Sequence, residues 1–170
     1  FRCREGDAFF GMGSQVSVNH RGHRVAVWTS EQGNGKSNRG EESELFGVMG
    51  DHYASYAPVP FATSSRKVGF WLNTETRSEF EFCQEGKFLR FENQGTSFEL
   101  VVFLGDTIGQ TVESFTARVG LPHPVARWAF GPWVDTIGGP AGIEEAIALI
   151  REHDIPVSAL WAEDWVGRLI

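Results

Sequence analysis

Two adjacent carboxylates lie between two tryptophans near the end of the 170-residue chain, in the segment Trp161-Ala162-Glu163-Asp164-Trp165. Aromatic walls with a few carboxylates that accept hydrogen bonds from hydroxyl groups are typical of a sugar-binding site. We therefore take Glu163, Asp164 and Trp165 as candidate substrate-binding residues. The alternative is a structural acidic pair that caps the following helix or pairs with an arginine.

The run Ile155-Pro156-Val157-Ser158-Ala159-Leu160 comes directly before this segment. A short apolar run opened by a proline predicts a buried strand, which would end at the acidic pair. In α/β barrels and doubly wound sheets, ligands bind at the C-terminal ends of the strands. Adjacent residues at a strand end point to opposite sides, so Glu163 and Asp164 would make a poor facing pair of catalytic carboxylates.

A second group of candidate residues opens a long polar stretch that runs from Thr29 to Glu44. Its root, Trp28-Thr29-Ser30-Glu31-Gln32, places an aromatic ring beside an acid and an amide. Loops of this length inside a compact domain are usually functional or disordered. We interpret this one as functional, with Glu31 and Gln32 as candidate substrate-binding residues, and a mobile surface loop is the alternative.

Short strands dominate the part of the chain that precedes these elements. Phe80 and Phe82 alternate with glutamates, and similar short apolar runs recur up to Leu104, which predicts an antiparallel β-sandwich. The helical spacing of Val112, Phe115 and Val119 predicts a helix near residues 110–119. We therefore expect a first domain over residues 1–121, ending at the rigid connector Leu121-Pro122-His123-Pro124.

The remaining residues, 122–170, predict the alternation of strand, helix and strand. The strand is expected over Val125 to Val134, the helix over Ile143 to His153, and the second strand before Glu163. Two strands and one helix cannot close a barrel or complete a doubly wound sheet. We therefore expect the second domain to be incomplete and the chain to be a fragment of a longer protein.

Charge and composition narrow the classes of partner. The net charge is −7, without a basic patch, which argues against nucleic acid and anionic membranes as partners, and no apolar run has the length of a membrane span. We expect no metal and no cofactor, because the five histidines lack ligand spacing; they are His20, His23, His52, His123 and His153. Reduced thiols are the simpler interpretation of Cys3 and Cys83, and one disulfide is the alternative.

Five segments in this order resemble glycoside hydrolase family 31, the family of α-glucosidases and α-xylosidases. They are Phe10-Gly11-Met12-Gly13, Arg21-Gly22 with Val27-Trp28, Tyr56 to Ser65, Pro124 to Trp133, and Ile155 to Glu163. Two of these regions, Trp28 to Gly35 and Trp161 to Gly167, are more similar to the sulfoquinovosidase branch, whose substrates are α-glycosides of a 6-sulfonated glucose. That branch has Lys or Gln where this chain has Ile137.

The resemblance implies a galactose-mutarotase-like β-sandwich followed by the first βαβ unit of a (β/α)8 TIM barrel. It implies a retaining α-glycosidase whose two catalytic aspartates lie on later barrel strands, so no catalytic residue is expected in this chain, which alone should be inactive. Glu163 would accept hydroxyl hydrogen bonds, and Glu31 and Gln32 would line the same pocket. The resemblance and the cysteine usage favour a cytoplasmic location. The alternatives are an α-glucosidase, an α-xylosidase or a non-catalytic carbohydrate-binding module, and the oligomeric state stays open.

Overall fold

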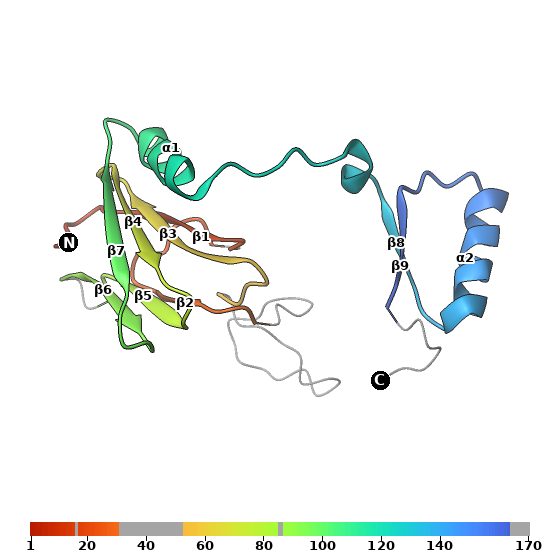
Figure 1. The fold of residues 1–170 in the computed structure, drawn as a ribbon, viewed down its shortest axis with the longest axis horizontal. Helices are drawn as coiled ribbons and strands as arrows, with labels where there is room; N and C mark the ends of the chain where they lie inside the picture. The colour runs from red at the N-terminus through yellow and green to blue at the C-terminus, as the bar shows by residue number, and fades with distance from the viewer. Residues whose placement is uncertain (16, 31–52, 85–86, 164–170) are drawn as a thin grey trace. The chain divides into compact units, whose positions relative to one another are not determined.

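The computed structural model describes residues 1–15, 17–30, 53–84 and 87–163 (Figure 1). The chain divides into two compact units, Phe1–Leu121 and Pro122–Ile170, and each is described here by itself. Over the described residues, the first unit contains two antiparallel sheets and a helix, and the second contains a parallel strand pair and a helix. The antiparallel character predicted for the first part of the chain is confirmed.

The larger sheet of the first unit has the strand order β1-β3-β4-β7. Its strands are β1 (Phe9–Gly13), β3 (Pro58–Ser64), β4 (Val68–Asn73) and β7 (Glu99–Leu104). A bulge interrupts the pairing of β1 with β3 between Gly11 and Gly13. Met12 at this bulge has a φ of 69°, and a glycine on each side lets the backbones approach closely.

The smaller sheet has the order β2-β5-β6. Its strands are β2 (Arg24–Val27), β5 (Ser78–Phe82) and β6 (Leu89–Asn93). Along β5, Phe80 and Phe82 face the core, and Glu79 and Glu81 lie on the opposite face, as the alternation of the sequence predicts. Arg24 on β2 holds these glutamates through ion pairs of 3.1 Å to Glu79 and 3.2 Å to Glu81.

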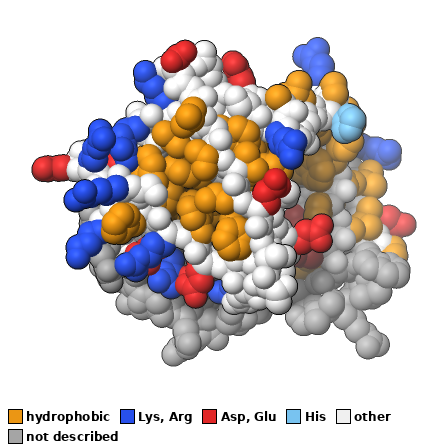
Figure 2. All heavy atoms as spheres, turned by 60° about the vertical axis from the view of Figure 1, so that its left-hand side comes forward, with side chains coloured by type: hydrophobic (Ala, Val, Ile, Leu, Met, Phe, Trp, Pro, Cys, Tyr) orange, Lys and Arg blue, Asp and Glu red, His pale blue; other side chains and the backbone are white. Residues whose placement is uncertain are grey.

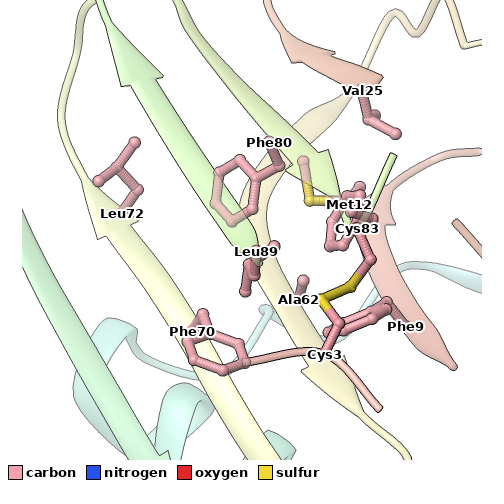
Figure 3. Close-up of a cluster of buried hydrophobic side chains, with 11 residues drawn as sticks. Cys3, Phe9, Met12, Val25, Ala62, Phe70, Leu72, Phe80, Cys83 and Leu89 are labelled. Atoms are coloured by element: carbon pink, nitrogen blue, oxygen red, sulfur yellow. A yellow bond between two sulfur atoms is a disulfide. The ribbon is translucent and has the colours of Figure 1, made fainter. Parts of the chain in front are cut away.

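Side chains from both sheets meet in one buried core between them (Figure 3). Its phenylalanines contact one another at close range, with a ring-centre distance of 5.2 Å between Phe9 and Phe82 and 5.8 Å between Phe80 and Phe82. The labelled core residues are Cys3, Phe9, Met12, Val25, Ala62, Phe70, Leu72, Phe80, Cys83 and Leu89. Phe9, Phe70, Phe80 and Phe82 are buried in this core, and Phe1 and Phe91 pack against it, so part of the abundant phenylalanine of the sequence serves to fill it.

A disulfide joins Cys3 to Cys83 within the core, so the interpretation of these residues as reduced thiols is wrong. The N–H of Cys3 donates to the carbonyl of Lys87 at 2.9 Å, which holds the first residues of the chain against the edge of β6. That pairing brings together two cysteines separated by 80 positions. The spacing of the cysteines in the sequence contains no sign of this contact.

Helix α1 (Ile108–Val119) covers the outer face of the larger sheet, close to the predicted range of 110–119. Thr107 caps it, because its side-chain oxygen accepts a hydrogen bond from the N–H of Gln110 at 3.1 Å. Gly120 ends it with a φ of 98°. Phe115 anchors the helix by stacking on Phe61, with ring centres 4.2 Å apart.

The second unit contains two parallel strands, β8 (Trp133–Thr136) and β9 (Ala159–Ala162), joined by α2 (Gly139–Glu152). The order strand, helix, strand agrees with the prediction, but the first and last residues of all three elements differ from the predicted ranges. The predicted strand over Val125 to Val134 is wrong in its first part, where Arg127–Phe130 forms a short 3-10 helix η1. Pro132 lacks an N–H for strand pairing, so β8 begins only after it.

The observed bounds of the other two elements of this unit also differ from the prediction. Helix α2 starts at Gly139 instead of Ile143, because Pro140 fits the first turn of a helix. Strand β9 starts at Ala159, three residues after Pro156, and the predicted burial of this strand is wrong, since its residues are mainly exposed. Among the described residues, no helix has the length and apolar character needed to cross a membrane.

Candidate functional site

Glu163 lies at the C-terminal end of β9, where the sequence places it. The register pairs Thr136 with Ala162, so Ile137 and Glu163 are the residues that follow the two parallel strands. The N–H of Glu163 donates to the carbonyl of Thr136 at 3.3 Å, which holds the two strand ends together. Both Ile137 and Glu163 are exposed. This edge therefore offers an accessible carboxylate beside an apolar side chain.

The strand ends are fixed by a side chain as well as by the backbone. The buried hydroxyl of Thr136 donates to the carbonyl of Trp161 at 3.2 Å. Beyond Ile137 the chain turns through Gly138, with a φ of 92°, directly into α2. Since backbone bonds, the Thr136 hydroxyl and this tight turn all act within a few residues, the positions of Ile137 and Glu163 are well determined by β8 and β9.

Three tryptophans form a row on this unit. The ring centres of Trp128 and Trp133 are 5.7 Å apart, and those of Trp133 and Trp161 are 6.3 Å apart. Each ring is about half exposed. Accessible aromatic surfaces are one of the features that a sugar-binding site requires. The sequence interpretation used Trp161 but did not connect it with Trp128 and Trp133, whose proximity depends on the η1 turn.

The other four candidate residues cannot be compared with the structure. Asp164 and Trp165 follow Glu163, and Glu31 and Gln32 follow Ser30, and all four lie outside the described ranges. Their assignment as substrate-binding residues stays a prediction from the sequence.

A pocket of about 310 Å³ lies at the root of the long polar stretch, on the first unit. Trp28, Ser30 and Tyr53 line it, together with side chains from β2, β5 and the segment before β5. The N–H of Ser30 donates to the carbonyl of Ser55 at 3.1 Å and fixes the base of this region. Tyr53 contacts the ring of His23, with ring centres 5.1 Å apart. The sequence interpretation recognised the Trp28 segment but missed Tyr53, which lies nine positions beyond the end of the polar stretch at Glu44.

Charged groups on the pocket wall are largely paired. Arg24 lines the pocket with Arg77 and Glu79. The side-chain hydrogen bond that Arg24 donates to Glu81, together with the charge of Glu79, raises the pKa of Arg24 above its ordinary value. The second arginine, Arg77, lies 3.9 Å from Glu79. Among the described residues, both arginines that line the wall are therefore paired with a glutamate.

The described residues contain no cluster of three or more metal-ligating side chains. A retaining glycosidase needs two carboxyl groups about 5–5.5 Å apart across the reacting bond. Asp135 within β8 and Glu163 after β9 are the carboxylates that the described part of these two strands contributes. The described part of the site is therefore an accessible strand edge whose carboxylate can accept hydrogen bonds.

Comparisons with known proteins support the family resemblance found in the sequence. The chain is 32% identical over 165 residues to a sulfoquinovosidase of Agrobacterium fabrum, covering 93% of this chain and 24% of that protein. It is 27% identical over 172 residues to a sulfoquinovosidase of Escherichia coli, covering 95% of this chain and 24% of that protein. The chain thus spans about a quarter of the length of these curated relatives. No family model matches it.

A solved structure of a family 31 sulfoquinovosidase from E. rectale, in complex with an aza-sugar inhibitor, has the same fold. The TM-score is 0.79 at 22% sequence identity, and the match covers 99% of this chain and 26% of that one. The antiparallel sheets of the first unit agree with this neighbour, as the sequence resemblance implied. The resemblance to glycoside hydrolase family 31 and to its sulfoquinovosidases is therefore confirmed.

Proposed function

We propose that the chain is part of a retaining α-glycoside hydrolase of family 31, similar to the sulfoquinovosidases and acting on a small-molecule or oligosaccharide α-glycoside. The observation that carries this proposal is the similarity of nearly the whole chain to two sulfoquinovosidases. An α-glucosidase or α-xylosidase of the same family is the second candidate. The observation that favours it is Ile137, which offers neither a charge nor a hydrogen bond to a sulfonate.

The second unit is proposed to be the first βαβ unit of the catalytic (β/α)8 barrel. The parallel pairing of β8 with β9 and the helix α2 between them support this assignment. In such barrels the ligand lies at the C-terminal ends of the strands, the edge at which Ile137 and Glu163 lie. The first unit would be the galactose-mutarotase-like β-sandwich domain that precedes the barrel.

Glu163 is proposed to accept hydrogen bonds from sugar hydroxyl groups, and Asp164, Trp165, Glu31 and Gln32 are proposed to line the substrate site. Nucleophile and acid/base are proposed to come from other barrel strands, so residues 1–170 alone would bind sugar without hydrolysing it. A cytoplasmic location also stays a proposal. The disulfide between Cys3 and Cys83 removes one argument for it, since disulfides persist mainly in oxidising compartments.

The test uses the full-length parent protein with nitrophenyl α-glycosides of sulfoquinovose, glucose and xylose. We expect hydrolysis of at least one of them with retention of anomeric configuration. NMR of the freshly released sugar measures that configuration. Glu163→Gln should lower kcat/KM by about 100-fold, because a hydrogen bond that tightens in the transition state is lost. Glu152→Gln, at the exposed end of α2, is the matched control. If Glu163→Gln lowers kcat/KM by less than about threefold, Glu163 does not bind the substrate.

The alternative of a non-catalytic sugar-binding module is tested with the same protein. If all three glycosides stay intact while calorimetry detects binding of the free sugars, the module interpretation replaces the enzyme. Hydrolysis by the pure 170-residue chain would contradict the placement of both catalytic carboxylates outside it.

A further inference from the structure

A buried threonine ends the first strand of the second unit. Large hydrophobic side chains are exposed at many positions of this chain, and Figure 2 shows a group of them among charged side chains. Exposed apolar surface therefore does not mark a site here by itself, whereas each buried polar side chain requires an explanation. Among the described residues of the second unit, the two buried ones are Thr136 and Gly139. Thr136 is 8% exposed, and it is the one of the two that carries a hydroxyl group.

The side chain of Thr136 points to the side of β8 that α2 covers. Trp133 and Asp135 are exposed on the opposite side, as the alternation of a strand requires. Helix α2 contacts both β8 and β9 (Figure 1). A strand position under a helix usually carries an apolar residue, and valine has nearly the same shape as threonine. The hydroxyl group therefore needs a reason beyond packing.

Thr136 holds β9 at two consecutive peptide groups. Its hydroxyl group donates to the carbonyl of Trp161 at 3.2 Å, and its own carbonyl accepts the N–H of Glu163 at 3.3 Å. These two peptide groups lie on either side of Ala162, the register partner of Thr136. Both distances are long for such bonds, so the end of β9 depends on the two bonds together.

The carboxylate of Glu163 depends on this backbone for its position. In the described part of the chain, no ion pair or side-chain hydrogen bond holds that carboxylate. Glu163 directly follows β9 and is exposed. A movement of the last peptide group of β9 therefore moves the carboxylate with it.

The end of β8 is itself held by α2. A Cβ atom at Gly142 would collide with the carbonyl oxygen of Ile137, so the helix packs directly on the backbone that follows Thr136. Gly139, in the first turn of the helix, is buried at the same junction. Because α2 fixes the end of β8, the two bonds of Thr136 can hold the end of β9 in a defined place.

We propose that Thr136 is a positioning residue for Glu163 in the reaction of the parent protein. This inference rests on the proposed glycosidase function, in which Glu163 accepts hydrogen bonds from sugar hydroxyl groups. Thr136 is buried and acts through the backbone of β9, without contact with the sugar. Its hydroxyl group holds the peptide group before Ala162 and its carbonyl holds the one after it. The carboxylate is thereby kept where a hydroxyl hydrogen bond tightens in the transition state.

The test uses the full-length parent protein with the α-glycoside that it hydrolyses best. Thr136→Val keeps the shape of the side chain and removes the hydroxyl group. We expect kcat to fall by about tenfold and KM to change by less than about threefold, because placement matters most in the transition state. Thr136→Ser keeps the hydroxyl group and should retain kcat within about twofold of the wild type.

Thr111→Val is the matched control for a purely structural effect. It removes another buried threonine hydroxyl group that donates to a backbone carbonyl, in the first unit. Below its melting temperature this variant should have the kcat of the wild type, although it is less stable. Thr136→Ala takes the place of the valine variant in every comparison if Thr136→Val does not fold.

A second measurement shows whether Thr136 acts through Glu163. In the Glu163→Ala background, Thr136→Val should change kcat by less than about twofold, because the carboxylate that it positions is absent. Hydrogen exchange followed by mass spectrometry should show exchange at the Glu163 N–H about tenfold faster in Thr136→Val than in the wild type.

The outcomes separate this inference from the proposed function. Equal losses of kcat from Thr136→Val in the two backgrounds would overturn the positioning role and leave the glycosidase in place. A Thr136→Ser variant as impaired as Thr136→Val would do the same. If the wild-type parent hydrolyses no α-glycoside, the proposed function fails and the role of Thr136 fails with it, a result that the wild type alone reveals.

Discussion

The hydroxyl groups of Thr63 on β3 and Thr111 on α1 form a buried hydrogen bond of 2.7 Å. Thr111 also donates to the carbonyl of Ile108 at 2.7 Å, so its single proton is already used and Thr63 must be the donor of the pair. The helix is thereby fixed to the outer face of the larger sheet by a polar contact inside an otherwise aromatic interface.

This direction of donation predicts unequal effects of two similar substitutions. Thr111→Val should cost about 1–3 kcal/mol of unfolding free energy, because the buried hydroxyl of Thr63 loses its acceptor. Thr63→Val should cost less than about 1 kcal/mol, because Thr111 keeps its bond to Ile108. Urea unfolding of the single variants measures both. Thr116→Val is the control, since Thr116 makes the same type of bond to Glu113 at an exposed position. Equal costs would contradict the assigned direction of donation.

The sequence predicts the antiparallel strands and the helix α1 because their patterns are local. Phe80 and Phe82 alternate with glutamates, and Val112, Phe115 and Val119 repeat at helical spacing, so each element is specified by neighbours in the chain. The contact of Thr63 with Thr111 links residues 48 positions apart and depends on how α1 packs on the sheet. Periodicity contains no information about such a contact.

The same distinction applies to the candidate site. Glu163 is found at a strand end because an apolar run followed by carboxylates is a local signal. Tyr53 and Arg77 line the pocket at Trp28 only after β2 and β5 pair, so no spacing in the sequence brings them together. The start of β8 was misjudged for a local reason, since Gly131 and Pro132 favour a turn where the apolar residues alone suggest a strand.

Loss of the disulfide between Cys3 and Cys83 should destabilise the first unit. The bond closes a loop of 80 positions, and cross-links of this kind typically contribute about 2–4 kcal/mol. We expect dithiothreitol to lower Tm by several degrees. The double variant Cys3→Ala/Cys83→Ala should melt lower without reductant and should not respond to it. Two cysteines that both react with a thiol reagent when the wild type is unfolded without reductant would show that the bond does not form.

Stability should also decrease in mildly acidic solution because of His20. This side chain is fully buried, and its Nε2 lies 3.1 Å from the carbonyl of Gly11. Desolvation by burial, with a smaller contribution from the charge of His23, lowers the pKa of His20 below the ordinary 6.5. The unfolded state therefore binds the proton first, and stability falls as the pH drops from 6.5 towards the lower pKa of the folded state.

Urea unfolding at several pH values between about 7.5 and 5 measures this loss. His20→Gln should weaken the pH dependence, since the amide does not titrate and can still donate to Gly11. His123→Gln, at an exposed position, should leave the pH dependence unchanged. If the wild type and His20→Gln lose stability in parallel, another group is responsible for the acid sensitivity.

Ile137 beside Glu163 has a consequence for substrate choice that rests on the proposed glycosidase activity. The two residues follow paired ends of β8 and β9, and Glu163 N–H donates to Thr136 across them. A negatively charged sugar substituent at this edge meets a carboxylate and an apolar side chain. Its charge is therefore not offset by these two residues, whereas a neutral hydroxyl group can donate to Glu163.

Ile137→Lys in the parent protein should therefore favour the sulfonated substrate. We expect the ratio of kcat/KM for the α-sulfoquinovoside over the α-glucoside to rise by about tenfold, equivalent to roughly 1.4 kcal/mol of differential binding. Ile137→Leu keeps the side chain apolar and should leave the ratio unchanged. A ratio that does not respond to the lysine would place the charged end of the substrate elsewhere, because a cation introduced next to a bound sulfonate must stabilise it relative to a hydroxyl group.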